Sequence, residues 1–147
     1  MKKRNLLVIP SILIIVLSVF PGFASRSAEQ QIEYLIEQRT EIMQDAFFGD
    51  ITIEEAETAL AGIETYPLLT DDVYSLRSWD AAQLDMVRDM HILNITHEKS
   101  FMIYLTYDVD IIWDMSGLSG NYTSEVSYYA VAVKDGENYL LSKFDSK

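Results

Sequence analysis

Apolar residues between positions 27 and 48 recur every three or four residues, which is the spacing of one face of an α-helix. The stripe consists of Ile32, Leu35, Ile36, Ile42, Met43, Ala46 and Phe47. Ser27 and Gln30 occupy the two positions of a capping box, and Gly49 suits the left-handed conformation that often ends a helix. The pattern therefore predicts a long helix that starts after Ser27 and ends near Gly49.

A shorter amphipathic helix is predicted next. Thr52 and Glu55 repeat the capping-box pattern, and Pro67 ends the segment. The apolar stripe of this helix consists of Ile53, Ala56, Leu60 and Ile63. The stretch 68–85 has no clear period, so we predict a connector with one or two short helical turns.

After Met86 the period changes from 3.6 to 2, which is typical of β-strands. Every odd position from Phe101 to Trp113 is apolar or aromatic, which predicts a long strand covered on one face. The stretch 87–96 is rich in β-formers and predicts an earlier strand, with His97–Ser100 as the turn that follows it.

Two further strands are predicted at the C-terminal end, Tyr122–Lys134 and Tyr139–Phe144. Asp135 and Gly136 between them are residues that favour the positive φ angles of a tight hairpin. The predicted fold is α+β, with two N-terminal helices packed on one face of a curved, four-stranded antiparallel meander sheet.

This order of elements, from Ser27 to Phe144, resembles the NTF2-like and cystatin-like α+β folds. The stretches Arg39–Gln44 and Phe47–Asp50 also resemble those of small uncharacterised exported proteins of Gram-positive bacteria. The resemblance implies a fold and an exported location, and no particular activity. Folds of this shape carry enzymes, ligand carriers, inhibitors and assembly modules.

The first 24 residues have the pattern of a secretory signal peptide. Lys2, Lys3 and Arg4 precede an uncharged apolar run over residues 6–20, and small residues lead to Ala24. The alternative is that residues 6–23 are retained as a membrane tether, because their length is near the minimum for a span. Both alternatives leave residues 25–147 as a single domain outside the cytoplasm, either secreted or anchored.

The predicted domain is acidic and contains no cysteine. Beyond residue 24, eight basic residues stand against 23 acidic ones, a net charge of −15. Such a surface repels phosphate backbones, so we predict no nucleic-acid partner. Without cysteine, the chain forms no disulfide, no thiolate zinc site and no lipid-modified cysteine.

One candidate surface is the outer face of the long strand, where Tyr104, Asp108, Asp110 and Asp114 point away from the apolar side. Alternate carboxylates could bind calcium, or raise one another's pKa for acid–base chemistry. A solvated sheet face explains them equally, and the spacing is not that of an EF-hand loop. We therefore predict a binding surface, with no metal and no cofactor.

The second candidate is a pocket that would contain Asp89 and His91, as in NTF2-like enzymes. These polar residues lie in the first predicted strand, and could line a cavity between sheet and helices or be exposed on an edge strand. The other histidine, His97, begins a zincin-like pattern, but Phe101 stands where the second histidine must be.

The sequence favours a non-catalytic binding or interaction module at the cell envelope, since no nucleophile elbow, phosphate loop or dinucleotide fingerprint is present. Its partner would be a protein or another envelope component. The alternative is a small NTF2-like enzyme or ligand carrier, which requires an enclosed cavity with His91 pointing inward.

Overall fold

In the described residues the chain forms three helices followed by a four-stranded sheet. The computed structural model describes residues 26–78 and 85–147. The elements are α2 (Ala28–Phe48), α3 (Ile53–Leu60), α4 (Leu68–Ser78), β1 (Met86–Phe101), β2 (Tyr104–Gly117), β3 (Gly120–Asp135) and β4 (Asn138–Ser146). The predicted signal peptide or tether lies outside the described residues. Within the described ranges, no helix has the length and apolarity needed to cross a membrane.

Both predicted capping boxes are present. Ser27 Oγ accepts the Gln30 backbone N–H at 3.2 Å, and Gln30 Oε1 accepts the Ser27 backbone N–H at 3.0 Å. Thr52 caps α3 in the same way, and Gly49 ends α2 with a φ of 80°. Local sequence therefore determines where these two helices begin and where the first one ends.

The connector with one or two short helical turns that was predicted over 68–85 underestimates the helix, because residues 68–78 form the eleven-residue helix α4, while residues 79–84 lie outside the described residues. Its buried positions are Leu68, Asp72 and Leu76, which follow one another at i, i+4 and i+8. An aspartate in the middle of the buried stripe interrupts the apolar period, and this hid the helix in the sequence.

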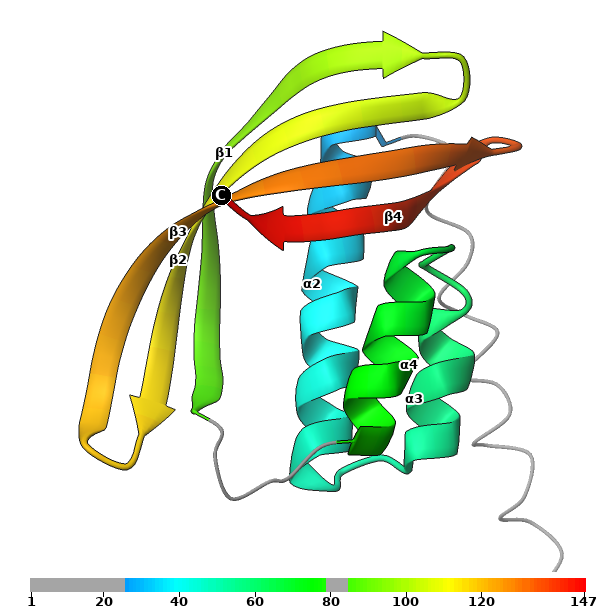
Figure 1. The fold of residues 1–147 in the computed structure, drawn as a ribbon. Coiled ribbons are helices and arrows are strands. Elements are labelled where there is room, and N and C mark those ends of the chain that lie inside the picture. Colours follow the sequence, from blue (N-terminus) through cyan, green and yellow to red (C-terminus); the bar gives the residue numbers. More distant parts are fainter. Residues whose placement is uncertain (1–25, 79–84) are drawn as a thin grey trace, which may run out of the picture.

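The four strands form an antiparallel meander in the order β1-β2-β3-β4. Figure 1 shows that the strands bend strongly, so that β4 lies beside the helices while the β2–β3 hairpin stands away from α2. The α+β prediction with an open, curved antiparallel sheet is confirmed, with three helices in the described residues instead of two.

The first hairpin turn is not where the sequence predicted it. His97–Ser100 continue β1, and the chain turns at Met102 and Ile103, where Met102 has a φ of 56°. A register shift between His97 and Lys99 lets the polar residues His97–Ser100 remain part of the strand. Such bulges are common on edge strands, which tolerate exposed polar side chains.

The hairpin predicted at Asp135 and Gly136 is present, one residue further along. Asp135 pairs with Asn138, so the two-residue loop is Gly136–Glu137, and Gly136 takes a φ of 63°.

The core lies between α2 and the middle of the sheet. Ile32 and Ile36 of α2 are fully buried, as are Val109 and Ile111 of β2, and Tyr107 is 1% exposed. This confirms the apolar face predicted for the long strand, but only along its central part. Phe101 and Ile103 of the same pattern are 71% and 48% exposed.

A buried ionic cluster of Arg39, Glu64 and Asp72 links α2, the α3–α4 connection and α4. Arg39 donates two hydrogen bonds to Asp72, at 2.7 and 2.8 Å. Its Nε also lies 3.3 Å from Glu64 Oε1, and the Glu64 side chain is fully buried. Burial raises the pKa of Glu64 to about 8, with a further contribution from the nearby Asp72 charge. Protonated Glu64 beside one Arg39–Asp72 pair leaves the cluster electrically neutral.

Candidate functional site

The predicted outer-face residues lie on the face of the sheet that points away from the helices. They alternate along β2 with the buried residues of the core. Tyr104 is 44% exposed. Asp108 forms an ion pair with Lys147 at 2.6 Å, and Asp110 accepts a 2.5 Å hydrogen bond from Ser127. This surface therefore exists, but its carboxylates already have partners within the chain.

Tyr104 also belongs to an exposed apolar segment that the sequence analysis did not recognise. This segment, the hairpin tip, consists of Phe101, Met102, Ile103 and Tyr104 and connects β1 with β2. Met102 is 87% exposed, and Phe101 is 71% exposed. The sequence signal for this segment is the run of four consecutive apolar or aromatic residues. The period of 2 instead assigned Phe101 and Ile103 to the buried face of the long strand.

Of the two positions left open for Asp89 and His91, the structure shows the exposed edge strand, and the enclosed His91 that an NTF2-like enzyme or carrier would require is not observed. The side chains of His91 and Asp89 are 56% and 62% exposed. A register shift between Val87 and Asp89 inverts the alternation of β1, so that Val87 pairs with Met115 on the core side while Asp89 pairs with Asp114 on the outer side. Neither Asp89 nor His91 therefore lines a cavity between sheet and helices.

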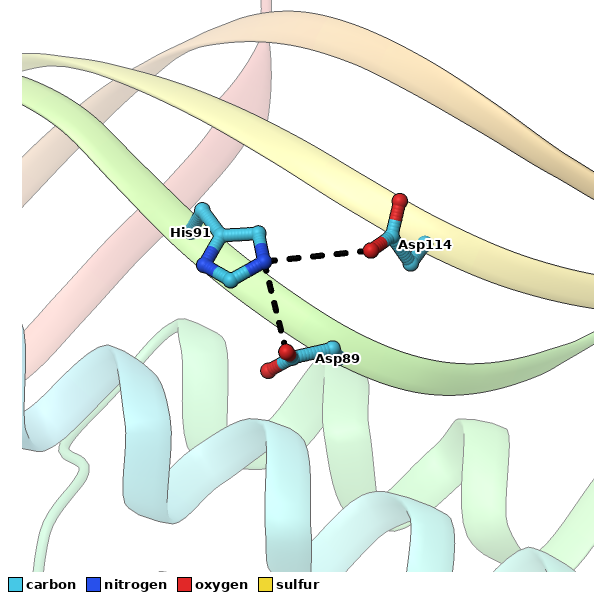
Figure 2. A group of neighbouring side chains, drawn as sticks. All are labelled: Asp89, His91 and Asp114. Atoms are coloured by element: carbon cyan, nitrogen blue, oxygen red, sulfur yellow. Dashed lines mark ion pairs between the residues drawn. The ribbon is translucent and has the colours of Figure 1, made fainter.

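The structure instead brings the two predicted sites together. Asp89 and His91 of β1 meet Asp114 of β2 on the outer face (Figure 2). His91 Nε2 lies 3.3 Å from Asp89 Oδ2 and 3.8 Å from Asp114 Oδ2. We call these three residues the Asp–His cluster. Sequence reasoning separated them because Asp114 is more than 20 positions from the others and strand register was unknown.

A groove does lie between α2 and the sheet, lined by other residues. Its volume is about 520 Å³, and its apolar lining includes Met43, Trp113, Met115, Tyr128 and Phe144. The rings of Tyr128 and Phe144 stack with centroids 4.3 Å apart. Burial raises the pKa of Tyr128, so its hydroxyl stays protonated at neutral pH.

Three polar side chains, Arg39, Thr40 and Gln44, line the α2 side of the groove. Gln44 Oε1 accepts the Val87 backbone N–H at 2.9 Å and so ties α2 to the start of β1. The indole N–H of Trp113 is buried and makes no well-formed hydrogen bond with any described residue. The groove thus combines an aromatic wall with a polar helix edge.

Comparison with known proteins supports the fold alone. No protein-family model and no curated protein sequence matches this chain. Among solved structures, it is similar to the crystal structure of the intermembrane space region of the chloroplast protein ARC6, with a TM-score of 0.51 and 15% identity. The match covers 82% of this chain and 97% of that one. The chain therefore shares an α+β arrangement with that region.

Proposed function

We propose that the protein is a non-catalytic interaction domain that works outside the cytoplasm and binds a partner protein through the hairpin tip. The observation that carries this proposal is the continuous exposure of Phe101–Tyr104. Contiguous exposed apolar surface marks interaction sites, and aromatic residues and methionine are enriched in interfaces. The N-terminal signal pattern supports the location, and the intermembrane-space origin of the solved ARC6 region is consistent with it.

The surroundings of the tip favour a protein partner. The chain beyond residue 24 has a net charge of −15, which disfavours anionic lipid headgroups and nucleic acid. The interface would continue from Tyr104 along the outer face to Asp108 and Asp110. Those carboxylates form the polar rim that commonly surrounds an apolar interface centre.

Photo-crosslinking tests this proposal. A benzophenone side chain at Met102 should yield one discrete crosslinked protein in cells that produce the full chain. The matched position is Leu118, which is fully exposed but lies in the β2–β3 turn between Gly117 and Ser119, without an apolar residue directly beside it in the sequence. Equal products at both positions, or none at Met102, would contradict the proposal.

Binding to the crosslinked partner should then depend on the tip. Replacing both Phe101 and Met102 with serine should weaken binding at least tenfold, since apolar and aromatic anchors usually dominate interface energy. Leu118→Ser should leave binding unchanged. Charge reversal of Asp108 and Asp110 should weaken binding less than the tip substitutions do, because rim charges contribute little affinity.

The groove favours a second candidate function, the binding of an apolar ligand. Its volume and aromatic lining suit a medium-chain carboxylate such as decanoate. In a Trp79→Phe variant, Trp113 is the remaining tryptophan, so its fluorescence should change saturably with decanoate. Ser124→Phe, which fills the groove, should abolish the change, whereas Glu125→Phe on the other face of β3 should not.

A further inference from the structure

We propose that the Asp–His cluster binds a divalent transition-metal ion, with Asp89, His91 and Asp114 as its protein ligands. The site is separate from the hairpin tip and from the groove, so it extends the proposed function and does not depend on it. It consists of one imidazole nitrogen and two carboxylate oxygens on adjacent strands (Figure 2).

The distances fit a metal centre. One ligand atom from each residue lies within 4.8 Å of the others. Ligands about 2.1 Å from a zinc ion in tetrahedral geometry are roughly 3.4 Å apart. The 3.3 and 3.8 Å separations from His91 Nε2 already match that value closely. Small rotamer adjustments of exposed side chains would close the site around an ion.

Each carboxylate has one oxygen held by a donor and the other directed at His91. Asp89 Oδ1 accepts the Met90 backbone N–H at 2.9 Å, and Asp114 Oδ1 accepts the Thr123 hydroxyl at 3.0 Å. The remaining Oδ2 atoms are the ones that lie nearest His91 Nε2. Hydrogen bonds to the second oxygen orient ligating carboxylates in metalloproteins, and their loss typically reduces affinity 10- to 100-fold.

The β1 bulges create this arrangement. Register shifts on both sides of the segment 89–92 place Asp89 and His91 together on the outer face, while Met90 and Ile92 pack against the core. Asp114 then stands directly opposite Asp89, where cross-strand side chains are in contact. The ligands are thus fixed on rigid, paired strands instead of a loop.

The ligand set indicates the kind of metal. An imidazole with two carboxylates suits zinc, cobalt, nickel or manganese, whereas calcium and magnesium prefer oxygen ligands alone. Three protein ligands leave further positions open for water or for a group from a partner. Arg88 lines the adjacent depression with Asp89 and Asp114, and its positive charge partly offsets the two carboxylates.

Titration of the full chain with Zn²⁺ by calorimetry tests the site. We expect one ion per chain, and at least tenfold weaker binding in each of the variants His91→Ala and Asp114→Asn. His97→Ala is the matched control because His97 contacts Tyr107 and Ser100 instead, and it should bind within twofold of the unaltered chain. A hundredfold excess of Ca²⁺ should not displace the zinc.

Bound Co²⁺ gives an independent readout. Its visible absorption should intensify above that of the aqueous ion in the unaltered chain and in His97→Ala, but not in His91→Ala. Zinc binding that survives His91→Ala unchanged, or no saturable binding below 100 µM Zn²⁺, would overturn the proposal. In that case the cluster is a surface histidine in contact with two aspartates and holds no metal.

Discussion

Replacing Arg39 with methionine should destabilise the domain by about 3–5 kcal/mol at neutral pH, which is the range for removing one partner of a buried ion pair. The Asp72 and Glu64 side chains are only 6% and 0% exposed, so solvent cannot compensate for the lost guanidinium. Methionine preserves much of the length and apolar stem of arginine, so the loss reports mainly on charge. Urea denaturation followed by circular dichroism measures the effect.

The exposed pair of Arg77 and Glu57 provides the matched control. Arg77 also makes two hydrogen bonds to one carboxylate, but its side chain is 66% exposed. Water replaces the lost contacts at such a site, and exposed pairs contribute little. Arg77→Met should therefore change stability far less than Arg39→Met, and equal losses would show that the Arg39 cluster has no special role.

The second large effect is a decrease in stability as the pH rises from about 4.5 to about 8. The pKa of Glu64 is near 8 in the folded protein, chiefly because burial disfavours its charged form, against 4.5 for an ordinary glutamate. Between these values the folded state binds one more proton than the unfolded state, so stability falls with pH. The total loss is on the order of 5 kcal/mol at most, at 1.36 kcal/mol per unit.

The variant Glu64→Gln distinguishes the pH dependence caused by Glu64 from that caused by other titrating groups. Glutamine resembles the protonated carboxyl and cannot ionise, so the variant should keep its stability as the pH rises to 8.5. It should be less stable than, or similar to, the unaltered protein at pH 5, and more stable by several kcal/mol at pH 8.5. Glu37 also has a raised pKa and contributes to both proteins alike. Parallel pH profiles of the two proteins would refute the assignment.

Local patterns in the sequence were sufficient for α2, α3 and the long strands, because capping residues and the hydrophobic period act within a few residues of one another. The same reasoning predicted only one or two short helical turns in place of α4, where Asp72 occupies a buried position. That aspartate is compatible with burial only because Arg39, 33 residues earlier, reaches it. No local pattern carries that information.

The candidate sites show the same division. The sequence pointed to Asp114 as part of the outer face of the long strand, and to Asp89 and His91 separately, as polar residues in the first predicted strand. It left open whether Asp89 and His91 line a cavity or are exposed on an edge strand, because a period of 2 in β1 would put them on the same side as Val87. The register shifts that turn them outward result from pairing with β2 and have no signature in the strand itself.

The sequence by itself determined the order of α2, α3 and the four strands, the acidic charge and the apolar face of β2, since each depends on residue type and short-range spacing. Tertiary structure alone decided the location of the groove, the exposure of the hairpin tip and the convergence of the Asp–His cluster. These features depend on sheet curvature and strand register. Sheet curvature and strand register are both set by contacts between residues far apart in the chain, because the burial of apolar side chains and the pairing of backbone hydrogen bonds must be satisfied together across the whole fold.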